Sequence, residues 1–332
     1  MAILHGGRLD EAIAKYGGNK NDWLDLSTGI NPNPYPVSGF APEFWQQLPQ
    51  NQNIDALKDC ARSAYGAPVT AACAAGAGVQ AIIQNLPVLF KPQSVAIIGF
   101  TYQEHGLCWQ QAGHDVLVAD GLESAEATAR IVIVVNPNNP DGRVIEPAQL
   151  VEIAKRLAAR GGLLVVDEAY CDTMKDTSVI SETGQAGLLV LRSFGKFFGL
   201  AGARLGFAFG PLPLIERLEE TLGPWAVSGP AIAVGCDALQ NKKWIKRARK
   251  RLWADRAAFE AKLSDADIEI VGATDHFVLI RHDYAKRLFE HFAKKQILTR
   301  PFPGREDWLR IGVPGKKPEL NRLTRELAEF TQ

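Results

Sequence analysis

The chain has 332 residues, of which 46% are hydrophobic and 22% are charged. This is the balance of a globular protein with one large domain or two smaller ones. Lysine and arginine together number 37, and so do aspartate and glutamate. The resulting net charge of zero excludes a general electrostatic attraction to nucleic acid or to an anionic membrane. A basic stretch at Lys242–Arg251 favours the solvated face of a helix over a binding patch.

Five cysteines are scattered along the chain, without a CxxC pair or a spacing typical of metal sites. An odd, dispersed set fits a reducing compartment, and no metal ion is expected. The first residues, Met1–Gly18, include early acidic residues and no apolar core of signal-peptide length. No apolar run reaches the roughly 18 residues that are needed to cross a bilayer. We therefore expect a cytoplasmic protein that binds neither nucleic acid nor a membrane.

The first two-thirds of the chain predict an arm followed by an α/β domain. Residues 27–50 are rich in proline, asparagine and glycine, which predicts an extended arm rather than a packed element. Beyond the arm, Pro147–Ala159 has helical periodicity with proline at its start. Four apolar runs have the pattern of strands buried on both faces: Ser94–Gly99, Ile131–Val135, Leu163–Val166 and Gly187–Leu191. This alternation predicts a mostly parallel sheet.

After residue 236 the pattern changes to that of an α+β domain. A long charged helix precedes a strand at His276–Ile280, a helix around Lys286–Lys295, a strand at Leu309–Ile311 and a closing helix. The sequence therefore predicts a large α/β domain over 40–235. A small α+β domain is predicted over 236–332, with the N-terminal arm, 1–39, grouped beside it.

Polar residues follow three of the predicted strands at their carboxyl ends, where open α/β sheets bind ligands. They form the segments Asn136–Arg143, Asp167–Tyr170 and Arg192–Lys196, the last of which continues to Gly206. A carboxylate at a strand end usually caps the next helix, and a lysine in a glycine-rich loop is usually only exposed. In this order and spacing, however, the segments resemble those of the enzymes of fold type I that depend on pyridoxal 5′-phosphate (PLP), the aspartate-aminotransferase-like fold.

This resemblance implies a cofactor and a role for each residue. Lys196 is then expected to carry PLP as a Schiff base. Asp167 faces the pyridine nitrogen, where its negative charge makes the ring an electron sink. Hydrogen bonds to the ring 3′-oxygen are assigned to Asn139 and Tyr170. Tyr102 stands where the family places the aromatic ring that stacks on the pyridine.

A glycine-rich turn at Gly76–Ile82 fits either a dinucleotide fingerprint or a site for a single phosphate. The run before the turn is a poor strand, and the next strand end offers no acid for a ribose. Backbone N–H groups of such a turn serve one phosphate equally well. The predicted phosphate contacts are the turn residues Gly78, Val79 and Gln80, together with Ser193 and Arg204 on either side of Lys196.

Further segments narrow the resemblance. They are His5–Gly7, Asp25–Pro36, Arg192–Gly202 and Gly223–Pro230, and they look like those of the threonine-phosphate decarboxylases of cobalamin biosynthesis. The histidinol-phosphate aminotransferases are the next family. They commonly have a Tyr-Pro pair that reaches the partner subunit's cofactor phosphate, whereas the comparable place here holds Leu48-Pro49.

The resemblance also implies a substrate site. Arg310, in a Leu-Arg-Ile-Gly segment, is assigned to the substrate α-carboxylate through a bidentate pair. Arg300 matches a residue that phosphate-handling members turn toward the substrate. The residues expected around a substrate with a carboxylate and a phosphate are His5, Gly29, Ile30, Asn31, Asn139, Arg300 and Arg310. The implied assembly is a homodimer with active sites at the subunit interface.

The implied reaction is decarboxylation of L-threonine O-3-phosphate to (R)-1-amino-2-propanol O-2-phosphate. Three alternatives stay open. The first is a PLP aminotransferase of the histidinol-phosphate type, because the choice depends on which bond at Cα the site holds perpendicular to the ring. The second is a PLP-binding regulator without turnover, although the intact set of Lys196, Asp167 and Arg310 speaks against it. The third is a nucleotide-binding protein built on Gly76–Ile82.

Overall fold

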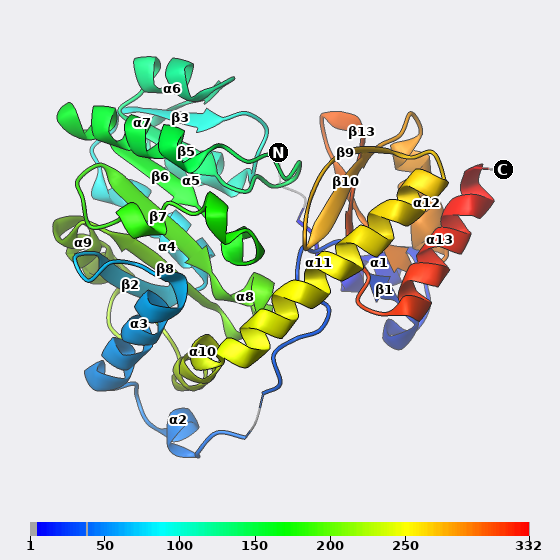
Figure 1. Ribbon diagram of the computed structural model, residues 1–332, viewed down its shortest axis with the longest axis horizontal. Coiled ribbons are helices and arrows are strands. Elements are labelled where there is room, and N and C mark those ends of the chain that lie inside the picture. The colour runs from blue at the N-terminus through cyan, green and yellow to red at the C-terminus, as the bar shows by residue number, and fades with distance from the viewer. Residues whose placement is uncertain (1–4, 38, 332) are drawn as a thin grey trace. The chain divides into compact units, whose positions relative to one another are not determined.

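The computed structural model of the chain describes residues 5–37 and 39–331, and it divides into two compact units (Figure 1). The first unit comprises the described parts of Met1–Asn33 and Arg247–Gln332, together with Pro140–Arg143. The second unit comprises the described parts of Pro34–Asn139 and Val144–Lys246. The sequence pattern places the corresponding boundaries after residues 39 and 235, and it does not anticipate that Pro140–Arg143 belongs to the first unit.

A seven-stranded sheet forms the centre of the second unit, in the order β2-β8-β7-β6-β5-β3-β4. Each pair from β7 to β4 is parallel, whereas β8 runs antiparallel to both β7 and β2. The mostly parallel sheet that the sequence predicts is therefore confirmed. The strands are β2 Ala72–Ala77, β3 Ser94–Ile98, β4 Asp115–Ala119, β5 Ile131–Val135, β6 Leu163–Asp167, β7 Leu188–Ser193 and β8 Leu205–Gly210.

Helices connect these strands, and Figure 1 shows them packed along the cyan and green strands. The α-helices of this unit are α2 Glu43–Gln46, α3 Asn51–Tyr65, α4 Val79–Asn85, α5 Glu104–Gln111, α6 Leu122–Thr128, α7 Pro147–Ala159, α8 Phe194–Phe197, α9 Leu212–Leu222 and α10 Gly229–Gln240. The 3₁₀ helices are η2 Pro87–Leu89, η3 Cys171–Thr173, η4 Lys175–Thr177, η5 Ile180–Glu182 and η6 Ala201–Ala203. The predicted helix at Pro147–Ala159 is confirmed as α7.

Burial explains which strands the sequence shows. Every residue of β5 and β6 is buried, and a continuous apolar run is the pattern of such strands. All four predicted strands are confirmed, as β3, β5, β6 and β7. Three strands were not predicted from the sequence. β2 consists of small residues, and β4 is a partly exposed edge strand. In β8, large apolar residues alternate with glycine and alanine.

The first unit is built on a four-stranded antiparallel sheet in the order β12-β13-β10-β9. A short parallel pair, β1 with β11, lies apart from that sheet. The elements are α1 Leu9–Tyr16, η1 Lys20–Asp22, β1 Leu24–Asp25, β9 Glu269–Thr274, β10 Phe277–Arg281, α12 Ala285–Lys294, β11 Ile297–Leu298, β12 Arg300–Phe302, β13 Arg305–Gly312 and α13 Lys317–Thr331. The predicted strands at 276–280 and 309–311 and the helix at 286–295 are confirmed as β10, β13 and α12.

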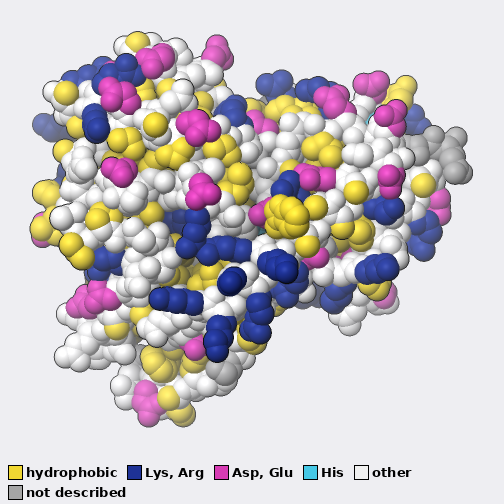
Figure 2. All heavy atoms as spheres, viewed as in Figure 1, with side chains coloured by type: hydrophobic (Ala, Val, Ile, Leu, Met, Phe, Trp, Pro, Cys, Tyr) yellow, Lys and Arg dark blue, Asp and Glu magenta, His cyan; other side chains and the backbone are white. Residues whose placement is uncertain are grey.

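The long charged helix is α11, Lys242–Asp265, which begins in the second unit and continues in the first. Trp244, Ala248 and Leu252 are buried along one side of it. Its exposed side includes Lys242, Lys243, Lys246, Arg247, Lys250 and Arg251. Figure 2 shows basic side chains gathered over the start of this helix, so the expected solvated face is confirmed. None of the described helices is long and apolar enough to cross a membrane.

The expectation of an unpacked arm over 27–50 is wrong in part. Asn31 and Tyr35 are buried, and the Tyr35 hydroxyl donates a hydrogen bond to Asp237 Oδ2 at 2.8 Å. The Tyr35 ring also packs edge-on against Trp244, with the centroids 5.1 Å apart. Proline and asparagine prevent long regular elements here, but their neighbours still pack, which composition does not reveal.

Candidate active site

The residues predicted to bind the cofactor all lie in the second unit, and several stand at the carboxyl ends of parallel strands. Asn139 follows β5, Asp167 ends β6, and Ser193 ends β7, from which α8 continues with Lys196. These three strands are neighbours in the sheet. Their ends therefore meet at one edge, where open α/β sheets bind ligands.

Asp167 is held from two sides. The residue is 3% exposed, Oδ1 accepts a hydrogen bond from the Ala169 backbone N–H at 3.0 Å, and Oδ2 lies 2.9 Å from His105 Nε2. His105 is buried and lies in the first turn of α5. A buried carboxylate with partners on both oxygens keeps one orientation. The sequence did not predict a role for His105. Its position three residues after Tyr102 is the feature of the sequence that could have suggested one.

Lys196 stands on a rigid segment. Phe194, Phe197 and Phe198 are buried on either side of it, and the rings of Phe194 and Phe198 stack 4.5 Å apart. The backbone is therefore fixed while the Lys196 side chain stays partly exposed. Its Nζ lies 5.7 Å from the centroid of the Tyr170 ring. The amine and Tyr170 are thus neighbours, as two groups that contact one small cofactor must be.

Two glycines shape the turn that is predicted to hold the phosphate. A Cβ on Gly78, where φ is +78°, would lie 2.8 Å from Arg204 Nη2. A Cβ on Gly206 would lie 2.3 Å from the Val79 backbone nitrogen. Only glycine at these positions brings the guanidinium and the backbone N–H groups of the turn this close together. A guanidinium beside backbone N–H groups at the start of a helix is a set of donors that fits a phosphate group.

Tyr102 is tied to the same turn by a side chain. Its hydroxyl donates to Gln80 Oε1 at 2.9 Å, and Gln80 Nε2 donates to Glu104 Oε2 at 2.9 Å. The sequence predicts only the backbone of Gln80 as a ligand. Glu104 was not predicted, because a glutamate at the start of a helix is an ordinary surface pattern.

The segment after β5 is fixed by its own amides. Asn136 is buried, and it donates to and accepts from the backbone of Ile145, at 3.1 and 2.8 Å. Asn138 is buried and accepts a hydrogen bond from Thr101 Oγ1 at 2.6 Å. Asn139, between these anchors and the next loop, stays partly exposed at the strand edge.

A buried ion cluster joins the ends of β6 and β7. Arg192 Nη1 donates to Glu168 Oε2 at 2.9 Å, and Arg192 Nη2 lies 3.1 Å from Asp172 Oδ2. The guanidinium carbon also lies 4.3 Å from the centroid of the Tyr65 ring. Burial raises the pKa of Glu168 against the opposing effect of Arg192. Burial disfavours the charged form of Arg192, but Asp172 and its neighbours raise the Arg192 pKa well above its usual value.

Strand geometry explains why this cluster and the cofactor residues do not compete for space. Consecutive strand residues point to opposite faces, and the register pairs Asp167 with Leu191. Asp167 and Ser193 therefore share one face, whereas Glu168 and Arg192 share the other. The sequence reading assigned no role to Arg192 or Glu168.

In the first unit, Arg310 joins two segments that the sequence singled out. It lies on β13 with 2% of its surface exposed, and its Nη2 donates to the Ser27 carbonyl at 2.9 Å. The Ser27 hydroxyl in turn accepts from the Gly7 N–H at 2.8 Å. A Cβ on Gly6 would lie 2.3 Å from the Ser27 carbonyl oxygen. The segment that follows His5 is thus packed against the residues that hold Arg310.

Arg300 stands directly opposite Arg310 in the pairing of β12 with β13. Opposite residues of an antiparallel pair emerge on the same face, where like charges are unfavourable without an anion. The predicted turn Gly29–Asn31 follows Ser27 closely in the chain. Asn31 is buried, and its Oδ1 accepts a hydrogen bond from the Asn33 N–H at 2.9 Å. Within the first unit, the structure thus pairs Arg300 with Arg310 and joins Arg310 to Ser27, which lies close in sequence to the Gly29–Asn31 turn.

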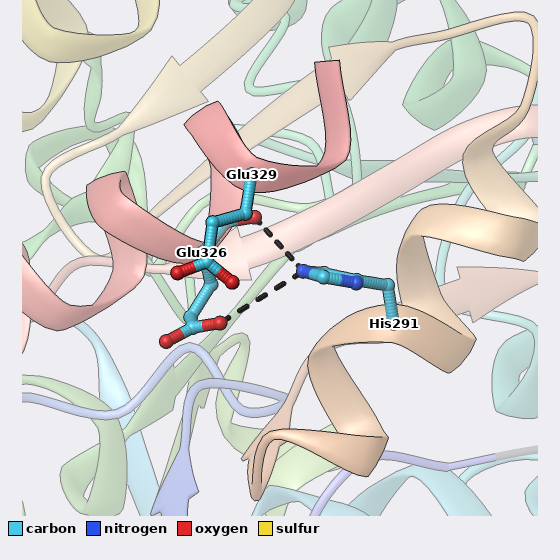
Figure 3. A group of neighbouring side chains, drawn as sticks. All are labelled: His291, Glu326 and Glu329. Atoms are coloured by element: carbon cyan, nitrogen blue, oxygen red, sulfur yellow. Dashed lines mark hydrogen bonds and ion pairs between the residues drawn. The ribbon is translucent and has the colours of Figure 1, made fainter. Parts of the chain in front are cut away.

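A second cluster of polar residues lies on α12 and α13. His291, Glu326 and Glu329 approach one another closely enough to hold a metal ion (Figure 3). However, Lys295 Nζ lies 3.0 Å from Glu326 Oε2 and 2.8 Å from Glu329 Oε2. His291 Nε2 lies 2.9 Å from the Glu326 carbonyl oxygen. Ion pairs and a helix carbonyl thus account for the cluster, and none of its members belongs to the predicted site.

Residues 46–327 match the family model described as aminotransferase class I and II. The chain belongs to this family, which confirms the aspartate-aminotransferase-like fold and PLP as the predicted cofactor. It is 41% identical to a threonine-phosphate decarboxylase of Sinorhizobium sp and 40% identical to one of Pseudomonas aeruginosa, each over 99% of this chain and 98% of the relative. Its identity to histidinol-phosphate aminotransferase 1 of Legionella pneumophila is 28%, over 96% of this chain and 90% of that one.

Solved structures show the same fold. Histidinol-phosphate aminotransferase from Sinorhizobium meliloti, in complex with pyridoxal-5′-phosphate, superposes with a TM-score of 0.80 at 20% identity, covering 99% of this chain and 95% of that one. L-threonine-O-3-phosphate decarboxylase from Porphyromonas gingivalis superposes with a TM-score of 0.74 at 20% identity, covering 92% of this chain and 98% of that one.

Proposed function

We propose that the chain is a PLP-dependent carbon–carbon lyase that converts L-threonine O-3-phosphate to (R)-1-amino-2-propanol O-2-phosphate in cobalamin biosynthesis. The observation that carries this proposal is the full-length identity of 41% and 40% to two threonine-phosphate decarboxylases. Identity to a histidinol-phosphate aminotransferase over a similar span is only 28%. The Leu48-Pro49 pair, in place of the Tyr-Pro of those aminotransferases, points the same way.

The roles proposed for the second unit's residues are those that the family resemblance implies, and their place at one edge of the sheet supports them. Bound PLP supplies an acceptor for the electrons of the bond that breaks at Cα. Asp167, held in place by His105, keeps a proton on the pyridine nitrogen. Lys196 would anchor the cofactor, and once released from it the side chain, as an ammonium, would deliver the proton that replaces the lost carboxylate at Cα. The cofactor phosphate would be held by Gly78, Val79, Gln80, Ser193 and Arg204, and the 3′-oxygen would be held by Asn139 and Tyr170.

Most of the residues that we propose to contact the substrate lie in the first unit, and Asn139 lies in the second. Arg310 binds the α-carboxylate through two parallel hydrogen bonds, and Arg300 binds the substrate phosphate. Two arginines opposite each other on one face of β12 and β13 suit a substrate that has two anionic groups. His5 and the turn Gly29–Asn31 line the rest of the substrate site.

The same proposal includes a cytoplasmic homodimer. Several large apolar side chains of the second unit are exposed, among them Trp45 at 71%, Leu48 at 58% and Trp225 at 54%. Tryptophan is enriched in protein–protein interfaces, so these are positions that we propose the partner subunit covers. Sedimentation equilibrium tests the assembly, and a mass of one chain at micromolar concentration would contradict it.

The reaction is tested with purified, PLP-loaded protein and L-threonine O-3-phosphate, without any keto acid. Carbon dioxide and aminopropanol phosphate are measured at the end point, with the Lys196→Ala variant as the blank. Equal amounts of both products support the proposal. No release, together with transamination of histidinol phosphate once 2-oxoglutarate is added, would overturn the reaction while leaving the fold and the cofactor site in place.

A further inference from the structure

We infer that the Gln80 side chain is a positioning residue for the Tyr102 ring, and that it is itself oriented by Glu104. The inference rests on the cofactor site proposed above, in which Tyr102 stacks on the pyridine. It gives Gln80 two separate tasks. Its backbone N–H serves the phosphate turn, and its side chain fixes the ring that covers the cofactor.

The hydrogen bonds set the direction of the Gln80 amide. Tyr102 Oη donates to Oε1 at 2.9 Å, and Nε2 donates to Glu104 Oε2 at 2.9 Å. In the opposite orientation the amide oxygen would face the Glu104 carboxylate, and two acceptors would meet. Glu104, with 9% of its surface exposed, therefore selects the orientation in which Gln80 accepts from the tyrosine.

The Tyr102 ring is held at a second point. It makes an edge-to-face contact with His105, with the centroids 6.1 Å apart and the planes at 87°. His105 is the residue that contacts Asp167. A ring held only at this edge can still swing about its Cβ, and the hydroxyl bond to Gln80 removes that freedom. Holding the ring before the cofactor arrives lowers the entropy lost on binding.

The position of Gln80 in the chain connects the Tyr102 ring to the phosphate turn. It is the second residue of α4, beside Val79, whose backbone nitrogen lies against Gly206. The phosphate turn and the stacking ring are therefore joined by one side chain. A variant that breaks this connection acts on ring binding and not on phosphate binding.

The experiment uses two ligands to separate the two tasks. Dissociation constants for PLP and for pyridoxal, which lacks the phosphate, are measured with the wild type, Gln80→Met, Tyr102→Phe and the double variant. Methionine matches the length of glutamine without its hydrogen bonds. The control is Gln84→Met, because Gln84 is an exposed glutamine on the same helix.

We expect each single variant to weaken both ligands by a similar factor, about three- to tenfold for the loss of one hydrogen bond. The double variant should be no worse than either single one, because both remove the same contact. The visible circular dichroism of the bound cofactor should fall in parallel, since the ring that covers it is no longer held. Gln84→Met should leave all of these unchanged.

Three results would overturn the inference: a loss for PLP but not for pyridoxal, additive losses in the double variant, or no loss in either single variant. Tyr102→Phe removes only a hydroxyl, so it keeps the test decisive even where Gln80→Met fails to fold. The readouts involve no substrate, so a failure to decarboxylate does not affect them. Absence of PLP binding to the wild type would instead contradict the proposed function.

Discussion

His105 Nε2 lies 2.9 Å from Asp167 Oδ2, and both side chains are buried. The backbone N–H of Ala169 donates a hydrogen bond to the other carboxylate oxygen, Oδ1. The orientation of Asp167 toward the sheet edge thus depends on a residue that lies 62 positions away in the chain.

We expect His105→Ala to weaken PLP binding and slow turnover, because one oxygen of a buried carboxylate loses its partner at a cost of about 1–3 kcal/mol. The pH at which the bound cofactor changes its absorbance should also shift. The control is His114→Ala, which removes a buried histidine that contacts the Pro87 carbonyl at 3.0 Å. That change should lower stability and leave the absorbance titration where it is; identical titrations for both variants and the wild type would contradict a role for His105.

Lys196→Ala should abolish turnover and remove the visible absorbance band of the bound cofactor, because no other amine is predicted to anchor it. Absorbance spectra and product release check both effects. Lys91→Ala, which removes an exposed lysine of the same unit, serves as the control and should behave as the wild type. Robust activity in Lys196→Ala would sink the assignment.

Arg310→Ala should weaken substrate binding by roughly 2–5 kcal/mol, as expected when a buried charge loses its partner. Arg310→Lys should recover only part of this affinity, since an ammonium cannot make the bidentate pair. Arg281→Ala, at an exposed position on the adjacent strand β10, should change it little. Substrate titration of the PLP-loaded variants measures the effect, and an unaltered affinity in Arg310→Ala would show that another group binds the carboxylate.

The cluster around Arg192 predicts a pH-dependent stability. Burial raises the folded-state pKa of Glu168 above its unfolded value, so its protonation favours the folded state. That contribution is fully present below the ordinary glutamate pKa of about 4.3, and it is lost as pH rises through the raised folded-state pKa. Glu168→Gln cannot titrate. The stability advantage of the wild type over this variant should therefore shrink as pH rises.

Urea unfolding of both proteins across this pH range measures the difference. Asp172→Asn is the companion variant, because it leaves Arg192 without its second carboxylate, and removing a partner from a buried ion pair costs about 3–5 kcal/mol. An advantage of the wild type over Glu168→Gln that grows with pH would show that Glu168 has the opposite shift.

Gly206→Ala should weaken PLP binding, because the new Cβ would lie 2.3 Å from the Val79 nitrogen and must displace the phosphate turn. Overpacking of this kind costs about 1–3 kcal/mol. Gly202→Ala is the matched control, since nothing lies within 4 Å of a Cβ there. Pyridoxal, without the phosphate, should bind Gly206→Ala with a smaller loss than PLP does; equal losses would mean that the turn is not the phosphate site.

The sequence predicted the parts of the fold that depend on local pattern. Fully buried parallel strands such as β5 and β6 appear as continuous apolar runs, and the polar residues after them mark the sheet edge. β8 was not predicted, because large side chains alternate with glycine and alanine along it, although all of its residues are buried. The contacts of His105 and of Arg192 were not predicted either. Asp167 lies 62 positions from His105 and Glu168 lies 24 positions from Arg192, and a local pattern does not show which distant segments meet.

The alternation at the end of β7 limits which changes in chain length the protein tolerates. Arg192 belongs to the buried ion cluster on one face of the sheet. The next residue, Ser193, points to the opposite face, which it shares with Asp167. Inserting or deleting one residue within β7 would exchange these faces, placing a cation where a hydroxyl is needed and an unpaired carboxylate in the core. We therefore expect natural variation in length to fall in the loops before β7 and after β8, and the interval from β7 to Lys196 to keep a constant length.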